Sequence, residues 1–376
     1  MLEPFRERIY VTRPVLPTLE EVTSKLRDIW DSKWLTNNGP QHSMLELELA
    51  EFLKVPYLSL FNNGTIALMV ACQSLRLSGE VITTPFTFAA TPHVLSWNNI
   101  TPIFCDVDAE TMNLDAEKVE SMITPHTTGI LAVHVFGTPC DVEKLQEVAD
   151  RYGLKIIYDA AHAFGVELDG RGIGNFGDIS MFSFHATKLY HTLEGGALVH
   201  GDKNLKPRID LLKNFGIKNE DEVVMPGING KLDEIRAAIG RIMLGYVEGE
   251  RLKRRQIYEI YEEELGGVAG ITLMPEVSAD VKLNYQYYVI RIDEKVFGRS
   301  RDEVYDALRD YNIFSRKYFH PLCSEYTCYR QLSSSRVENL PVANQIARQV
   351  LSLPNYGELA LDDVRKICAI LKSFGK

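Results

Sequence analysis

The sequence predicts an α/β protein with two domains, the larger of which is built on a mostly parallel β-sheet. Its 376 residues are too many for one small core. Between residues 55 and 200, short apolar runs alternate with amphipathic segments, and such alternation gives a mostly parallel sheet covered on both faces. After Lys231 the pattern changes. We therefore expect a large domain at residues 1–245 and a smaller α+β domain at residues 246–376.

The apolar runs of the first domain are typical of buried strands. Between two of them, Val142–Arg151 has helical periodicity, with Asp141 placed to cap the helix and Gly153 to end it. Ligands of such sheets bind beyond the carboxyl ends of the strands, so residues that follow each run are candidates for a site. The runs are Tyr57–Phe61, Val81–Thr83, Pro102–Cys105, Ile130–Phe136, Lys155–Tyr158, Ile179–Phe184 and Ala197–His200.

The second domain has longer helical patterns and a different set of strands. A helical segment covers Leu232–Val247, and its charged continuation reaches Glu264. The sequence then predicts a strand at Tyr285–Ile292 and helices at Arg301–Asp310 and Ala360–Ser373.

Composition argues against several classes of protein. The net charge is −10, and the one dense basic run, Arg251–Arg255, is typical of a solvated helix face, so we expect no nucleic-acid partner. No stretch approaches the roughly 18 apolar residues that cross a membrane, and the N-terminus carries acids and lacks the apolar core of a secretory signal. The six cysteines show no zinc-type spacing. We expect a cytoplasmic protein without a membrane partner, disulfides or a bound metal.

The most informative segment is Gly177–Gly196, which contains Lys188 four residues beyond the strand that ends at Phe184. A single lysine is usually a solvated charge. Upstream, however, Asp159 directly follows a buried strand pattern, where a carboxylate is costly without a cationic partner. The protonated ring nitrogen of pyridoxal phosphate would be such a partner and would let the cofactor act as an electron sink. The alternative is that Asp159 caps the next helix.

Two other strand ends fit the same ligand. Gly64 and Thr65 open a helix after the first strand, and free amides at a helix start favour a phosphate. Phe88 follows the second strand and could lie over a flat ring. Each is a weak indication alone, because an ordinary turn and a core phenylalanine look the same.

Taken together, these segments resemble the sugar-aminotransferase family of fold-type I pyridoxal-phosphate enzymes, named for the DegT and StrS proteins. The resemblance runs from Trp34–Pro40 to Arg316–Pro321. Its most specific element is Ser183-Phe-His-Ala-Thr-Lys188 followed by Glu194-Gly-Gly, at family spacing after Asp159-Ala-Ala-His162. It implies an aspartate aminotransferase-like large domain with a smaller C-terminal domain.

The resemblance also implies roles for individual residues around the cofactor ring. Lys188 would be the catalytic residue and carry pyridoxal phosphate as an imine. Asp159 would bond the ring nitrogen, and His162 the phenolic oxygen. Many relatives have Gln at the position of His162, so the hydrogen bond to the phenolic oxygen would come from a different type of side chain here. Phe88 corresponds to the aromatic side chain that stacks on the ring.

At the phosphate, the resemblance implies that the amides of Gly64 and Thr65 act with the Ser183 hydroxyl. Asn229 matches the family residue that reaches the phosphate of the neighbouring subunit, which implies a homodimer with shared sites. Lys231 stands where the usual family pattern has Arg.

The implied reaction takes an amino group from glutamate, passes through pyridoxamine phosphate and delivers the group to a nucleotide-linked keto-sugar, in deoxyaminosugar (O-antigen or lipopolysaccharide) biosynthesis. The loop Trp34–Pro40 resembles that of members that aminate carbon 4 of dTDP-4-keto-6-deoxyglucose. Amination at carbon 3 of a 3-keto sugar, or of a GDP- or UDP-linked sugar, stays open. Arg316, Tyr318 and His320 could meet the sugar diphosphate; equally, they could be solvated loop residues.

Three other functions fit the sequence less well. Gly172–Gly177 fits the dinucleotide pattern G-x-G-x-x-G, but a strand follows it where a helix is required, so an NAD-dependent oxidoreductase is disfavoured. Sugar dehydratases that resemble this family have His in place of Lys188. An inactive regulator on the same fold would not need Asp159, His162 and Lys188 together.

Overall fold

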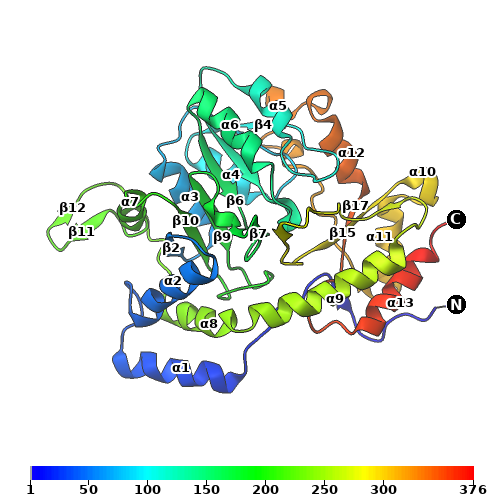
Figure 1. The fold of residues 1–376 in the computed structure, drawn as a ribbon, viewed down its shortest axis with the longest axis horizontal. Coiled ribbons are helices and arrows are strands. Elements are labelled where there is room, and N and C mark those ends of the chain that lie inside the picture. The colour runs from blue at the N-terminus through cyan, green and yellow to red at the C-terminus, as the bar shows by residue number, and fades with distance from the viewer. Residues whose placement is uncertain (1) are drawn as a thin grey trace.

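The computed structural model describes residues 2–376, and a seven-stranded sheet forms the centre of its larger part (Figure 1). The strand order is β2-β10-β9-β6-β5-β3-β4, and β10 alone runs antiparallel to its neighbours. The α/β fold and the mostly parallel sheet are therefore confirmed. The strands are β2 (Tyr57–Phe61), β3 (Glu80–Thr83), β4 (Thr101–Phe104), β5 (Thr127–Val133), β6 (Lys155–Asp159), β9 (Ile179–Ser183) and β10 (Gly196–His200).

Helices cover both faces of this sheet, as the alternation predicted. α3 (Gly64–Ser74), α4 (Ala90–Trp97) and α7 (Leu205–Leu212) share one core cluster with the strands. The other face packs against α2 (Pro40–Phe52), α5 (Ala116–Val119), α6 (Val142–Tyr152) and α8 (Glu234–Leu244). α1 (Leu19–Ser32) packs on α8 (Figure 1). Within residues 2–376, no helix combines the length and the apolar character needed to cross a membrane.

The α6 helix begins and ends where the sequence predicted. The Asp141 side chain accepts a hydrogen bond from the Lys144 amide at 3.0 Å, which satisfies a first-turn donor. Gly153 takes a left-handed conformation with φ of 65°, which glycine adopts at little cost, and the helix ends there.

The C-terminal part has its own core beneath a small antiparallel sheet of order β13-β15-β17. Phe5 and β1 (Ile9–Tyr10) pack onto this second core, with β1 paired to β16 (Ile313–Phe314). The division into domains at residue 245 stays a prediction. The other elements are α9 (Val247–Leu265), β13 (Ile271–Thr272), β15 (Tyr288–Ile292), α10 (Glu294–Phe297), α11 (Arg301–Asp310), α12 (Pro341–Gln349), β17 (Val350–Leu353) and α13 (Leu361–Lys372). β7 (Glu167–Leu168) and β8 (Arg171–Gly172) form a short hairpin to which β14 (Val281–Lys282) adds a third strand, and β11 (Ile217–Asn219) forms a second hairpin with β12 (Glu222–Val223).

Most predicted bounds shift by at most one residue, but the strand expected at Ile130–Phe136 is β5, Thr127–Val133, and two further elements differ from the predictions. The helical segment expected through Glu264 is two helices, α8 and α9, which are separated at Gly245–Tyr246. The strand expected from Tyr285 begins at Tyr288, because Tyr285 takes a left-handed φ of 53° that interrupts an extended chain. The apolar pattern was correct in both regions, but burial alone does not report where a helix or strand is broken.

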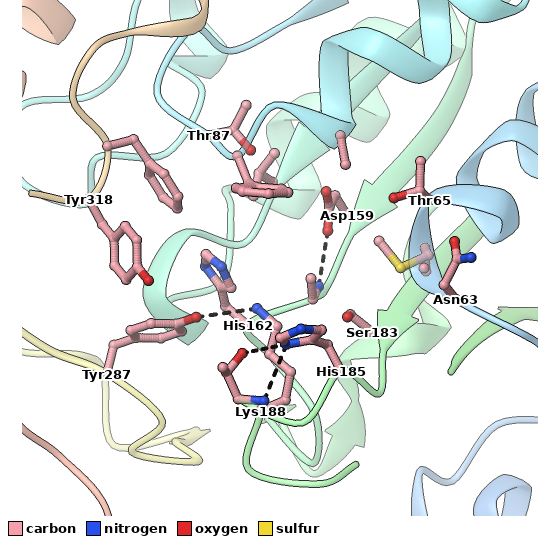
Figure 2. A pocket seen from close by; sticks show the side chains of 18 of the residues that line it. Asn63, Thr65, Thr87, Asp159, His162, Ser183, His185, Lys188, Tyr287 and Tyr318 are labelled. Atoms are coloured by element: carbon pink, nitrogen blue, oxygen red, sulfur yellow. Dashed lines mark hydrogen bonds between the residues drawn. The ribbon is translucent and has the colours of Figure 1, made fainter. Parts of the chain in front are cut away.

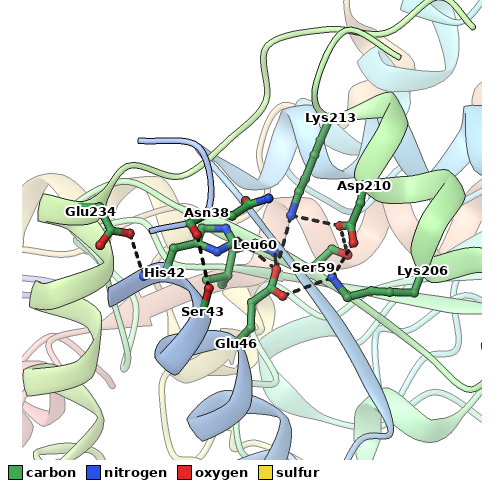
Figure 3. A network of polar contacts seen from close by, with 10 residues as sticks. All are labelled: Asn38, His42, Ser43, Glu46, Ser59, Leu60, Lys206, Asp210, Lys213 and Glu234. Carbon is green, nitrogen blue, oxygen red and sulfur yellow. Dashed lines mark hydrogen bonds and ion pairs between the residues drawn. The ribbon is translucent and has the colours of Figure 1, made fainter. Parts of the chain in front are cut away.

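A charged network fixes the sheet edge from which α3 departs (Figure 3). The Glu46 carboxylate on α2 is contacted by the ammonium groups of Lys206 at 3.1 Å and Lys213 at 3.3 Å. Both lysines also pair with Asp210, which accepts a hydrogen bond from Ser59 in β2 at 2.8 Å. Burial opposes ionisation of Glu46, but the two lysines outweigh it and its pKa is lowered. The network therefore ties α2 and α7 to β2 with its charges matched.

Candidate active site

A cavity of about 300 Å³ lies beyond the carboxyl ends of the central strands, between the two parts of the chain (Figure 2). Most of the residues predicted from the sequence meet there, although they come from separate segments. Those that line the cavity are Gly64, Thr65, Phe88, Asp159, His162, Ser183, Lys188 and Tyr318.

Asp159 ends β6 and is 5% exposed. Its Oδ2 accepts a hydrogen bond from the Thr91 hydroxyl at 2.8 Å, and its Oδ1 accepts one from the Ala161 amide at 3.0 Å. Burial raises the pKa of this carboxyl, while the two hydrogen bonds and the charge of Lys188 oppose that rise. Within residues 2–376, no basic side chain forms an ion pair with it. A buried carboxylate of this kind suits a cationic ligand group.

His162 is buried and presents a hydrogen-bond donor to the cavity. Its Nδ1 accepts from the Phe136 amide at 3.2 Å, so in the neutral ring the proton is on Nε2. Burial lowers the pKa of this imidazole well below its ordinary value, and Lys188 lowers it further. The ring is therefore neutral and can donate from Nε2 to an oxygen in the cavity.

The start of α3 forms the other end of the cavity. Asn63 caps the helix, with its Oδ1 accepting from the Ile66 amide at 2.8 Å. The amides of Gly64 and Thr65 belong to the first turn and so have no partner inside the helix. The Ser183 side chain lines the cavity beside them (Figure 2). Free amides and a hydroxyl at a helix start form an anion site.

Two backbone hydrogen bonds fix the loop that carries Lys188. The Lys188 amide donates to the His185 carbonyl at 2.9 Å, and the Thr192 amide to the Phe184 carbonyl at 3.0 Å. The loop returns through Gly196, whose Cα lies so close to α3 that an added Cβ would be 2.8 Å from the Cα and N of Gly64. The glycine at position 196 therefore lets β10 pass directly beneath the start of α3.

These features fit pyridoxal phosphate. The buried Asp159 carboxylate suits the cationic ring nitrogen, the amides at the start of α3 suit the phosphate, and the Lys188 amine suits the aldehyde. Phe88 lines the same cavity with 64% of its surface exposed, which leaves its ring available to a ligand.

Three predicted residues do not line the cavity. Asn229 is exposed, and its carbonyl accepts a 3.5 Å hydrogen bond from the side chain of Asn62. Arg316 and His320 are exposed on the loop on either side of Tyr318. Their proposed contacts with the substrate stay predictions.

Several lining residues were not singled out from the sequence, among them His185, Glu194, Thr87 and Tyr287. His185 and Glu194 belong to the motif around Lys188, and their side chains are 3.6 Å apart at the mouth of the cavity, so the motif itself was the signal. Thr87 lies next to Phe88. Tyr287 gave no signal, because its segment reads as an ordinary strand.

Comparisons with known proteins find relatives over nearly the whole chain. Residues 18–372 match the DegT/DnrJ/EryC1/StrS aminotransferase family. A dTDP-4-amino-4,6-dideoxy-D-glucose transaminase of Escherichia coli is 49% identical over 96% of this chain and 98% of its own length. One of the same name from Shigella dysenteriae is 43% identical over 97% of this chain and 98% of its own. The crystal structure of DesI in the presence of its TDP-sugar product superposes with a TM-score of 0.93 at 36% identity, covering 99% of this chain and 94% of DesI.

Proposed function

Because the chain belongs to the DegT/DnrJ/EryC1/StrS aminotransferase family, we propose that it moves the amino group of glutamate to carbon 4 of dTDP-4-keto-6-deoxyglucose. The observation that carries the substrate is the 49% identity, over nearly the full length of both chains, to a dTDP-4-amino-4,6-dideoxy-D-glucose transaminase. The product would be dTDP-4-amino-4,6-dideoxyglucose, with the gluco configuration at carbon 4.

The predicted residues that line the cavity have distinct roles in this reaction. Bound pyridoxal phosphate supplies an electron sink for the carbon that loses its proton. Asp159 holds the ring nitrogen protonated, and the Nε2–H of His162 donates to the phenolic oxygen. The amides of Gly64 and Thr65, with the Ser183 hydroxyl, hold the phosphate.

Lys188 carries the proton transfers. With glutamate and the cofactor bound, Lys188 Nζ would act as the general base that takes the proton from the donor carbon and passes it to the cofactor. In the second half of the reaction the same nitrogen delivers a proton to the sugar carbon that receives the amine. Aromatic side chains around the cavity, Phe88 and Tyr318 among them, limit the access of water to these steps.

A substrate panel tests the assignment. The purified enzyme is incubated with glutamate and, separately, 4-keto and 3-keto dTDP-sugars and a GDP-linked 4-keto sugar, and the new amine is located by NMR. We expect amination of the 4-keto dTDP-sugar and 2-oxoglutarate formed in equal amount. Reactions without glutamate are the control. Amination of only the 3-keto or the GDP-linked compound would overturn the proposed substrate and leave the aminotransferase assignment intact.

The enzyme is also proposed to act as a homodimer in which Asn229 completes the site of the other subunit. In support of this, the side chain of Asn229 does not line the cavity of its own chain. The hairpin β11–β12 projects from the body of the molecule nearby (Figure 1) and exposes Val223 to 67% and Ile217 to 41%. Exposed apolar side chains on a projecting arm are typical of a surface that another chain covers.

Hybrid dimers test the shared site. Lys188→Ala and Asn229→Ala subunits should each be strongly impaired alone, whereas their hybrid has one site with both residues intact. After random mixing, about a quarter of the sites should be complete, so activity should return to that fraction of the wild-type value.

The matched control mixes Lys188→Ala with Asp159→Ala. These two residues line the same cavity of one chain, so no hybrid site has both and activity should stay absent. Equal recovery in the two mixtures, or full activity of a monomer in gel filtration, would contradict the shared site.

A further inference from the structure

A short segment of the C-terminal part, residues 284–287, reaches across the cavity to both catalytic loops. Asn284 is 1% exposed, and its Nδ2 donates to the carbonyls of His162 at 2.8 Å and Phe164 at 3.0 Å. These two hydrogen bonds fix the backbone of the turn that follows Asp159 at two positions, His162 and Phe164. The His162 ring is therefore held in place from the C-terminal part as well as by Phe136.

Gln286 makes the corresponding contact with the other loop. Its side-chain Oε1 accepts a hydrogen bond from the backbone amide of Leu189, the residue after Lys188, at 3.0 Å. The backbone amide of Gln286 donates to Asn284 Oδ1 at 3.0 Å. The side chain of Arg254, which is 2% exposed, donates to the carbonyl of Gln286 at 3.3 Å. These hydrogen bonds hold residues 284–286 in one conformation, next to the residue that contacts Lys188.

Tyr287 reaches the reacting nitrogen itself. Lys188 Nζ donates to the Tyr287 hydroxyl at 3.2 Å, as the dashed line in Figure 2 shows. The tyrosine ring packs against the His162 ring at a centroid distance of 4.7 Å and an angle of 57°. Tyr285 faces elsewhere, with its ring against Tyr258 at 5.4 Å.

We propose that Tyr287 is a positioning residue for Lys188, whose hydroxyl holds Nζ on the reacting side of the cavity through a segment clamped by Asn284 and Gln286. The proposal rests on the role of Lys188 in the proposed function. A lysine side chain has four rotatable carbon–carbon bonds, so its amine must be restrained if it is to meet a single carbon. A hydroxyl suits the task in both protonation states, since it accepts from an ammonium group and donates to a neutral amine.

Tyr287→Phe tests the proposal, because it removes the hydroxyl and keeps the ring against His162. We expect kcat to fall about tenfold to a hundredfold, with KM for glutamate and for the sugar within about twofold of wild type. The pH midpoint of the visible absorbance of the cofactor-loaded enzyme should move down by about one unit, because the protonated nitrogen loses an acceptor. Melting temperature should stay within about two degrees of wild type.

Tyr285→Phe is the matched control, since it removes a tyrosine hydroxyl two residues away that makes no contact with the cavity. It should leave kcat, the pH midpoint and the melting temperature unchanged. A wild-type kcat and pH midpoint in Tyr287→Phe would overturn the proposal, and so would an equal loss in both variants, which would mark a packing effect. Borohydride labelling of the wild-type enzyme tests the proposed function separately from the role of Tyr287. A label on a residue other than Lys188 would refute the proposed function, independently of the result for Tyr287→Phe.

Discussion

Lys188→Ala is expected to lower turnover by at least about ten-thousandfold, because the substitution removes both the nucleophile that carries the cofactor and the base that moves the proton. No other lysine lines the cavity within the described chain, so no neighbouring amine can take over. The variant should still bind pyridoxal phosphate, since Asp159 and the amides at the start of α3 are unchanged. Single-turnover kinetics with glutamate and equilibrium dialysis of the cofactor measure the two effects separately.

Lys155→Ala provides the matched control for this change. Lys155 is at the opposite end of β6 from Asp159, where it pairs with Asp178 on the surface at 2.8 Å. Its loss should leave turnover unchanged. In the wild-type enzyme, borohydride reduction and peptide mapping should place the label on Lys188. Substantial turnover by Lys188→Ala, or a label on another lysine, would be incompatible with the mechanism.

Asp159→Ala is expected to lose most activity, about a hundredfold or more, because the ring nitrogen would no longer be held protonated. Asp159→Asn removes the negative charge and keeps the shape of the side chain. Its amide oxygen can still accept the hydrogen bond that the Ala161 amide now donates to Asp159 Oδ1 at 3.0 Å. We therefore expect both variants to be impaired to a similar degree. Steady-state kcat and the absorbance of the bound cofactor at neutral pH measure the effect.

The outcome for the asparagine variant decides what the carboxylate does. Near-normal turnover in Asp159→Asn, with a severe loss in Asp159→Ala, would assign the residue to holding the loop through Thr91 and Ala161. Near-normal turnover in both would show that the position has no part in activating the cofactor.

The parts of the site that the sequence predicted are those fixed by local chain geometry. Asp159 and Lys188 follow strand ends, and Gly64 opens a helix directly after a strand, so the parallel sheet brings them to one edge. The alternation of apolar runs indicated this edge, because the direction of a strand determines which of its ends faces the site, whereas the roles of the individual residues came from the family resemblance.

The parts that could not be predicted depend on contacts between distant segments. Tyr287 reaches Lys188 only because the chain bends at Tyr285, and nothing in an apolar strand pattern reports a left-handed residue. Arg316 and His320 flank Tyr318, yet only Tyr318 lines the cavity, since side-chain direction on an irregular loop follows no period. The break at Gly245–Tyr246 separates two helices that follow each other without a proline or a polar loop, so the sequence pattern showed one helix with a charged continuation.

The reversed strand β10 has a consequence for the order in which the protein can assemble. β2 has no other neighbour in the sheet, and its pairing with β10 joins Phe61 to Gly196. During synthesis, β2 and the helix start that follows it must therefore wait for more than half of the chain to emerge before they can join the sheet. Contacts of such large sequence separation slow folding, because loop closure costs entropy before the pairing compensates for it. The phosphate end of the pocket should thus form later than the strands β3 to β6, so a nascent chain that ends before β10 would have the ring-nitrogen partner Asp159 without a competent phosphate cradle.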